Sequence, residues 1–170
     1  MTNLINELTT RTGFRFQVRQ AQPSDTKTLA EFFTHVTPDD LRFRFMEGLK
    51  EVGPDLINML ASVDHNLVEN FLAFDPLDGS MIATGMLACT SDRARAEVAM
   101  AVHEDYKRRG VSWELLQHIT EFAKKKGVKI LESIESPQNN AAIVLEREMG
   151  FTAVRDPDDP SFLILRKALN

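Results

Sequence analysis

Residues 96–112, Ala-Glu-Val-Ala-Met-Ala-Val-His-Glu-Asp-Tyr-Lys-Arg-Arg-Gly-Val-Ser, join a short apolar run to a basic turn with one glycine. The first eight of these residues are mostly small, apolar or β-branched, which predicts a buried strand. From residue 111 to about residue 126 the apolar residues recur at helical spacing. A second strand from 128 to 136 and a second helix from 138 to 149 follow, and Gly150 stands where a glycine commonly ends a helix. The predicted order is strand, helix, strand, helix.

The turn ahead of the first of these helices has the features of a phosphate-binding site. Lys107, Arg108 and Arg109 supply positive charge, and Gly110 lets the chain turn into the helix. The first N–H groups of a helix have no internal partners, and the helix dipole favours an anion there. Two common phosphate loops are excluded, because there is no G-x-x-x-x-G-K-[ST] and no G-x-G-x-x-G after the first predicted strand. A basic triplet alone is more often a solvated loop, but this position favours a ligand.

This pattern resembles the core of the Gcn5-related N-acetyltransferases (the GNAT family), whose ligand is acetyl-CoA. In that family a strand is followed by an R/Q-x-x-G-x-G/A turn, a helix, a strand, an asparagine and a helix that ends in Gly-Phe. Here the turn runs from Lys107 to Ser112, the asparagine is Asn139, and Gly150 precedes Phe151. Lys107 stands where Gln or Arg is usual, and Ser112 where Gly or Ala is usual. The resemblance covers about residues 14–168.

The resemblance implies where acetyl-CoA binds. The backbone amides of the turn would hold the diphosphate, and the pantetheine arm would lie along the central strand and bond to its backbone. Asn139 would bond the pantetheine or a backbone group, or would simply cap its helix. The implied cofactor-binding residues are Met100, Ala101, Val102, Lys107, Arg108, Arg109, Gly110, Val111, Ser112 and Asn139.

Glu97 is the candidate catalytic residue. Alternation along the strand sets Glu97, Ala99 and Ala101 on one face, opposite the apolar Val98 and Met100. Two small side chains beside a carboxylate leave room for a slender ligand. Transfer of an acetyl group needs a neutral amine, and a carboxylate whose pKa is raised by burial can take the proton. The alternative is an edge charge that pairs with a nearby arginine.

A subgroup resemblance favours the catalytic interpretation. The strand is similar to Ala-Glu-Phe-Ala-Val of the bacterial protein lysine acetyltransferases that acetylate acyl-CoA synthetases, in which the glutamate is the base. Those enzymes also carry Pro-Glu-Ser-Leu-x-x-Arg-Phe, and residues 38–45 here are Pro-Asp-Asp-Leu-Arg-Phe-Arg-Phe. The match implies that Arg44 and Phe45 lie on the substrate side, the alternative being a plain amphipathic helix. Glu146 stands where many small-amine acetyltransferases have a tyrosine as general acid.

Composition bounds the remaining possibilities. The chain has 170 residues, enough for one domain, and a formal net charge of −5, which disfavours nucleic acid as a partner. Cys89 is the only cysteine, which excludes an internal disulfide and a site of several thiolates, and the four histidines lack metal-ligand spacing, so no metal is expected. Neither a signal peptide nor a membrane-spanning run is found. We expect a soluble, cytoplasmic protein without a membrane partner.

The rest of the chain completes an α/β fold of three layers. We expect residues 1–13 to be an N-terminal extension, with one helical turn or a frayed end, and residues 14–170 to form a single acetyltransferase domain. Helices are predicted to begin at residues 23, 37 and 54, although residues 41–45 alternate as in a strand. Further strands are predicted at 14–19, 67–74, 80–89, 152–154 and 162–165. The sheet would be mixed and mostly antiparallel, with helices on both faces.

Three functions are consistent with these features. The resemblance favours an acetyl-CoA-dependent N-acetyltransferase that works by direct attack, with Glu97 as base and a protein lysine, such as one on an acyl-CoA synthetase, as acceptor. A small amine could replace the protein lysine as acceptor. A module that senses acyl-CoA without turnover is the third alternative, since Lys107, Ser112 and the missing tyrosine depart from the family pattern.

Overall fold

A mixed sheet forms the centre of the molecule, which the computed structural model describes from residue 3 to residue 170. Its eight strands follow the order β1-β2-β3-β4-β5-β6-β8-β7. The neighbouring pairs are antiparallel except β5 and β6, which run parallel. The strands are β1 (Asn6–Thr9), β2 (Arg15–Gln20), β3 (Val68–Phe74), β4 (Met81–Cys89), β5 (Arg95–Val102), β6 (Ile130–Glu135), β7 (Thr152–Arg155) and β8 (Leu163–Ala168). The predicted mixed, mostly antiparallel sheet is confirmed.

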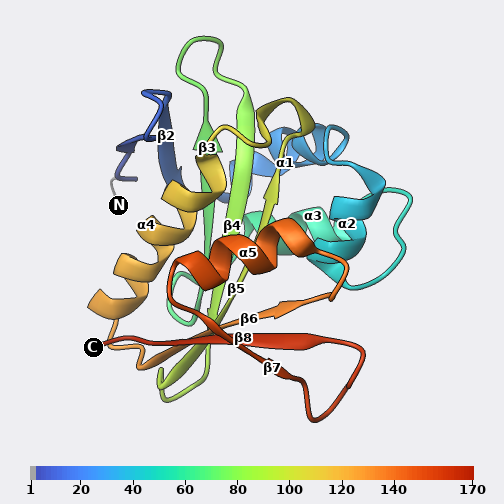
Figure 1. Ribbon diagram of the computed structural model, residues 1–170. Coiled ribbons are helices and arrows are strands. Elements are labelled where there is room, and N and C mark those ends of the chain that lie inside the picture. Colours follow the sequence, from blue (N-terminus) through green and yellow to red (C-terminus); the bar gives the residue numbers. More distant parts are fainter. Residues whose placement is uncertain (1–2) are drawn as a thin grey trace.

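Helices cover both faces of this sheet and complete the three predicted layers. The helices are α1 (Thr26–Phe33), α2 (Pro38–Phe45), α3 (Pro54–Ala61), α4 (Val111–Lys125) and α5 (Asn140–Glu148). In Figure 1, α4 and α5 cross in front of the sheet, and α1, α2 and α3 lie on its other side. Among residues 3–170, no helix has the length and apolar character needed to cross a membrane.

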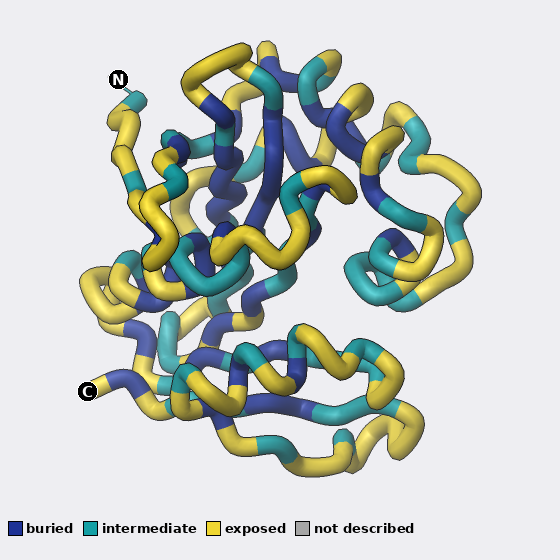
Figure 2. Tube along the Cα trace, turned by 45° about the horizontal axis from the view of Figure 1, so that its top comes forward, coloured by how far each residue is buried: buried dark blue, intermediate teal, exposed yellow. Residues whose placement is uncertain are grey.

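The sheet carries a hydrophobic core on each face, and Figure 2 shows the buried strands running through the middle of the molecule. On the α4 side, Leu115 and Ile119 pack with Val98 of β5 in one cluster. On the α1 side, a second cluster includes Leu29 and Ala101. The sequence predicts open space beside both Ala99 and Ala101 of β5. This prediction is wrong at Ala101, which is only 5% exposed. The second core fills that space.

The helical prediction for residues 38–45 is correct, although their apolar residues alternate. Thr37 caps the helix, because its Oγ1 accepts a hydrogen bond from the Asp40 N–H at 3.1 Å. Pro38 occupies the first turn, where its missing N–H costs nothing. Met46 ends α2 with a left-handed backbone, at φ 59°. The capping signals at both ends outweigh the strand-like alternation between them.

Residues 6–9 belong to the sheet, which corrects the expectation of a helical turn or a frayed end, while residues 1 and 2 of the predicted extension lie outside the described residues. β1 pairs antiparallel with β2 over its four residues. Just after β1, Thr10 is buried and packs against Gly110 in the turn before α4, where a Cβ added to the glycine would lie 3.1 Å from Thr10 Cβ. The stretch expected to be an extension thus supports the predicted ligand-binding turn.

The parallel pair at the centre of the sheet separates after a short contact. β5 and β6 are in register only from Arg95–Ile130 to Glu97–Glu132. β5 then continues to Val102 beside β4, while β6 continues to Glu135 beside β8. Figure 1 shows the two strands leaving one another, with α5 in front of them. Beyond Glu97, one edge of β5 therefore has no neighbouring strand.

Close packing of α4 on β4 makes Gly85 sensitive to substitution. A Cβ at this position would collide with Cδ1 of Ile119 and approach Cγ of Met100 to 3.3 Å. We expect Gly85→Ala to lower the free energy of unfolding by about 1–3 kcal/mol, as overpacking does in a filled core. Gly48→Ala is the control, because no atom lies within 4 Å of its added Cβ. Urea denaturation measures both, and equal stability of the two variants would contradict the packing described.

Candidate active site

The turn between β5 and α4 presents a run of free backbone amides. Within residues 3–170, no hydrogen bond has the backbone N–H of any residue from 107 to 113 as its donor. Arg108 and Gly110 have left-handed backbones, with φ of 64° and 84°. Left-handed residues that alternate with right-handed ones gather N–H groups into a concave nest that binds anions. Since α4 starts at Val111, its dipole adds partial positive charge there.

The side chains of this turn contribute less charge than the sequence indicated. Lys107 Nζ lies 2.5 Å from Asp40 Oδ2 of α2. The Arg109 guanidinium stacks on the rings of Phe14 and Tyr106, at 4.3 and 4.8 Å from their centroids. Both cations are thus held by the protein itself. Arg108 is exposed and makes no hydrogen bond or ion pair within residues 3–170, so it and the backbone amides are what the turn offers to an anion.

The free edge of β5 continues from this turn toward Glu97. His103 N donates to Ile82 O beside β4, so the odd-numbered residues of β5 direct their backbone groups toward β4. Successive residues of a strand point their N–H and C=O groups to opposite sides. Met100 and Val102 therefore face the open edge, whereas Ala101 faces β4. Of the three predicted backbone partners, two are available to a ligand.

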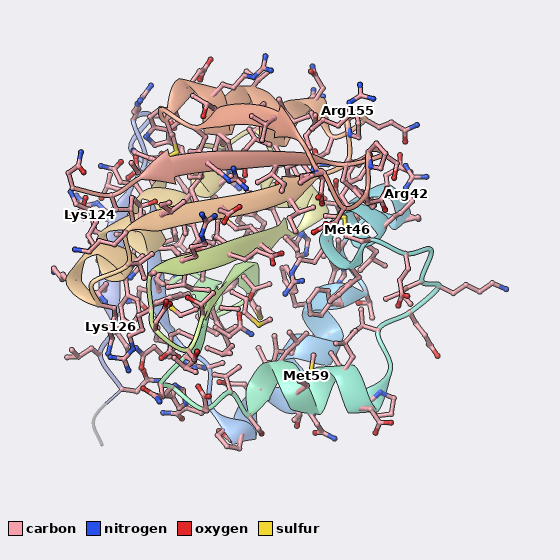
Figure 3. All side chains as sticks on the ribbon, turned by 90° about the horizontal axis from the view of Figure 1, so that it is seen from below. Arg42, Met46, Met59, Lys124, Lys126 and Arg155 are labelled. Carbon is pink, nitrogen blue, oxygen red and sulfur yellow. The ribbon has the colours of Figure 1, made fainter. Side chains whose placement is uncertain are left out.

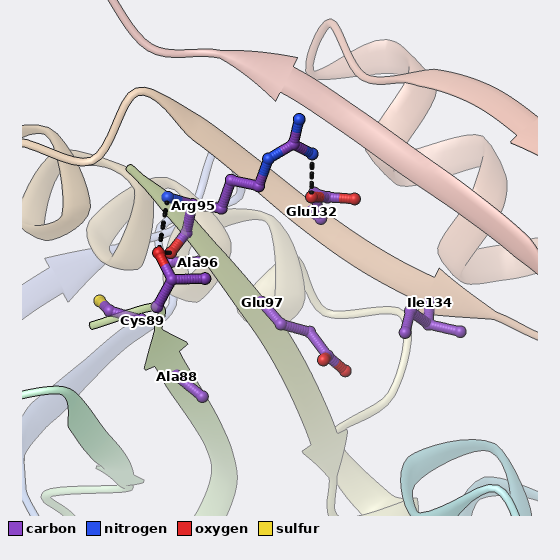
Figure 4. Close-up of a pocket in the computed structure, with 8 residues that line it drawn as sticks. Ala88, Cys89, Arg95, Ala96, Glu97, Glu132 and Ile134 are labelled. Carbon is purple, nitrogen blue, oxygen red and sulfur yellow. Dashed lines mark hydrogen bonds and ion pairs between the residues drawn. The ribbon is translucent and has the colours of Figure 1, made fainter. Parts of the chain in front are cut away.

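Glu97 lies at the point where β5 and β6 separate. It lines an open cavity of about 290 Å³ together with Ala88 and Cys89 of β4 and with Glu132 and Ile134 of β6. Figure 4 shows its side chain leaving β5 beside these residues. Partial burial among the strands raises the pKa of the Glu97 carboxyl, an effect that the positive charge of Arg44 opposes. The Glu97 carboxyl is exposed enough to exchange a proton with water, and its pKa is raised toward neutrality.

The two predicted substrate-side residues of α2 have different surroundings. Phe45 packs on Phe33, with 5.6 Å between ring centroids, and joins the core between α1 and the sheet. Arg44 is half-buried, and its charge is close enough to Glu97 to affect the pKa of both groups. Figure 3 shows Arg42 and Met46 of α2 near one end of the strands, away from Lys124 and Lys126 at the end of α4. Of the two, only Arg44 lies close to Glu97.

Two neighbouring carboxyl groups, of buried Glu146 and half-buried Glu135, lie on the β6 side of the gap between β5 and β6. Glu146 of α5 is 3% exposed and its Oε2 has no hydrogen-bond partner in the described chain. Burial, together with the neighbouring Glu135 of β6, raises the pKa of Glu146 to about 8. Glu135 accepts hydrogen bonds from Ser133 Oγ at 2.7 Å and from Asn139 Nδ2 at 3.1 Å. The Asn139 side chain therefore neither caps α5 nor points freely to a ligand.

The sequence signal for this pair is weak, because Glu146 stands out only as a replacement for tyrosine. Its partner Glu135 lies eleven positions earlier, at the end of a strand, where no local pattern marks it. Although several carboxylates gather around the gap, residues 3–170 contain no group of three or more His, Cys, Asp or Glu side chains arranged to hold a metal ion.

Glu146→Gln should change how stability depends on pH. The pKa of Glu146 is raised from 4.5 to about 8, so the folded state keeps a proton that the unfolded state releases between these values. Stability of the wild type therefore falls as pH rises from about 4.5 to about 8. The glutamine variant lacks this loss, and we expect it to gain on the order of 3 kcal/mol relative to wild type between pH 5 and pH 8.

Urea denaturation at several pH values measures this difference. Glu121→Gln is the control, because Glu121 is exposed on α4 and its side chain is 57% accessible. Its stability should follow the wild-type pH dependence. Parallel pH dependence of the Glu146→Gln variant and the wild type would show that Glu146 is ionised in the folded protein.

Known proteins share this fold and sequence pattern. The curated acetyltransferase PA5475 of Pseudomonas aeruginosa is 29% identical over 159 residues, which is 92% of this chain and 86% of that protein. The crystal structure of the GNAT domain of S. lividans PAT superposes with a TM-score of 0.90, at 23% identity and 97% coverage of both chains. Spermidine N-acetyltransferase from Vibrio cholerae, solved with CoA and spermine, gives a TM-score of 0.73 at 13% identity, over 91% of this chain and 95% of that one.

The match to a family description covers the site itself. The model of the acetyltransferase (GNAT) family matches residues 32–151, from the end of α1 to Phe151, three residues after α5. That range includes β5 and β6, Glu97 and the turn of residues 107–113 with its free backbone amides, here called the amide-lined turn. Because the match spans most of the chain, and because the fold agrees with solved members of the family, this protein belongs to the acetyltransferase (GNAT) family.

Proposed function

We propose that this protein is an N-acetyltransferase that moves the acetyl group of acetyl-CoA to a lysine of a protein, in the cytoplasm, with Glu97 as general base. Membership of the GNAT family supports acetyl transfer from acetyl-CoA. The choice of a protein lysine is supported by the resemblance of residues 96–100 and 38–45 to protein lysine acetyltransferases. A lysine of an acyl-CoA synthetase is the first acceptor to examine.

The chain offers a continuous path on which acetyl-CoA can bind. The free amides of residues 107–113 suit a diphosphate, because backbone donors at a helix start match its charge and shape. From there Met100 and Val102 offer backbone groups along the open edge of β5 to the pantetheine arm. This path ends near Glu97, where the strands meet. Acetyl-CoA supplies a thioester carbonyl that an amine can attack.

Glu97 would remove the proton that keeps the acceptor unreactive. A free lysine amine with a pKa near 10.4 is about 99.9% protonated at pH 7, a cost of roughly 4–5 kcal/mol for attack. A carboxylate whose pKa is raised by partial burial can accept that proton near neutral pH. The single observation that carries the proposal is the position of Glu97, in an open cavity at the end of the free edge.

Glu97→Gln should separate binding from turnover. Because glutamine has nearly the same size but cannot take a proton, we expect kcat to fall by about 10²–10⁴-fold at neutral pH. Wild-type activity should rise with pH as Glu97 loses its proton, and the variant should lack this rise. Acetyl-CoA should still raise Tm, as a ligand of the native state does. With Glu121→Gln as the control, full turnover in Glu97→Gln would remove Glu97 from the mechanism.

Gly110→Ala tests the amide-lined turn. Both its backbone, at φ 84°, and its contact with Thr10 oppose a Cβ, so the turn must change shape. We expect the Kd for CoA to rise about tenfold or more, since each charge-assisted hydrogen bond lost is worth about 1.5–3 kcal/mol. Gly127→Ala is the matched control: its φ is also left-handed, at 87°, but no atom lies nearby. Isothermal titration with CoA measures both, and equal affinities would place the diphosphate elsewhere.

The acceptor class follows from a screen with labelled acetyl-CoA. Lysine peptides and an intact acyl-CoA synthetase are compared with spermidine and single amino acids. A small-amine acceptor is the second candidate, favoured by the fold similarity to spermidine N-acetyltransferase. CoA binding without thiol release from any acceptor would indicate an acyl-CoA-sensing module.

A further inference from the structure

Arg44 is a cation without an anion in the candidate site. Its Nε is enclosed and unpartnered, and no hydrogen bond or ion pair within residues 3–170 uses its guanidinium. The ring of Phe45 lies 4.7 Å from the guanidinium carbon. Burial lowers the pKa of Arg44 to about 10, so it stays charged at neutral pH. An enclosed, unpaired charge is costly, and a ligand that pairs with it is favoured.

Three other arginines on strands of the sheet pair with carboxylates of the chain. Arg95 and Arg166 both bind the Glu132 carboxylate, at 2.8 and 3.0 Å. Arg19 makes a bidentate pair with Asp25. Glu97 is the carboxylate whose charge influences Arg44, but the two make no salt bridge. The terminal N–H groups of Arg44 thus remain unpaired near the proposed base.

We propose that Arg44 is a specificity-determining residue that binds a carboxylate next to the acceptor amine, so that the preferred acceptor is a lysine flanked by an acidic residue. A guanidinium binds a carboxylate through two parallel hydrogen bonds, which fixes orientation as well as affinity. The acidic neighbour would occupy Arg44 while the lysine amine approaches Glu97. This inference rests on the proposed function, because it concerns the acceptor of the same reaction.

A matched pair of peptides tests the inference. The peptides acetyl-Gly-Lys-Asp-Gly-amide and acetyl-Gly-Lys-Asn-Gly-amide differ by one charge at nearly equal size. In the wild type, kcat/KM should favour the aspartate peptide by about 10- to 100-fold, the range expected for a charged hydrogen-bonded pair. Arg44→Met should bring the ratio close to one, and Arg44→Lys should leave an intermediate ratio because it keeps the charge without the fork.

Arg42→Met is the control variant. Arg42 lies on the same helix but is exposed and donates to Gln138 at 3.2 Å, so its loss should leave the peptide ratio unchanged. The rise of Tm with CoA shows that each variant still folds and binds the carrier. A second pair, 4-aminobutyrate against butylamine, shows whether a free amino acid also supplies the carboxylate.

Two outcomes would overturn the inference. One is an equal kcat/KM of the wild type for both peptides. The other is a loss in Arg44→Met that is the same for both peptides, because a merely structural role lowers the two rates together. If neither peptide is acetylated, the proposed function fails. Whether Arg44 binds a carboxylate is then decided by calorimetry, in which the CoA-bound protein is titrated with the aspartate and asparagine peptides whose lysine is already acetylated. Preferential binding of the aspartate form that Arg44→Met abolishes would still support the carboxylate site.

Discussion

The short pairing of β5 with β6 is the constraint on which the candidate site depends. Their register covers three residues on each strand before the strands separate, β5 staying with β4 and β6 with β8. The separation frees one edge of β5, and it opens the cavity at Glu97. A sheet that continued its ladder to Val102 would satisfy those backbone groups internally and leave nothing for a ligand to bond.

Helix α2 connects the two sides of this gap. Asp40 pairs with Lys107 in the amide-lined turn, and Arg42 donates to Gln138 just before α5. Arg44, one turn beyond Asp40 on the same helix, lies near Glu97. Because these contacts are polar and mostly exposed, each contributes little to stability. Together they hold α2 across the gap, so one short helix contacts both the turn before α4 and the surroundings of Glu97.

Local patterns predicted the elements well but not the contacts between them. The caps at Thr37 and Pro38 and the glycine turn at 110 follow from nearby residues, and helices form there. The strand at residues 6–9 was missed because β1 is stabilised by pairing with β2, which no local pattern reveals. The stacking of Arg109 on Phe14 and the pairing of Glu146 with Glu135 are likewise long-range. Burial of a polar residue is a property of the fold, and alternation or helical period cannot supply it.

The central claim is that the backbone amides of residues 107–113 hold the diphosphate of CoA. Amide hydrogen exchange tests it most directly, because free N–H groups exchange rapidly and hydrogen-bonded ones are protected. We expect these amides to exchange rapidly in the free protein, since none has a partner within residues 3–170, and to become protected when CoA is added. Exchange that stays rapid in this segment at saturating CoA, with protection appearing elsewhere, would contradict the account.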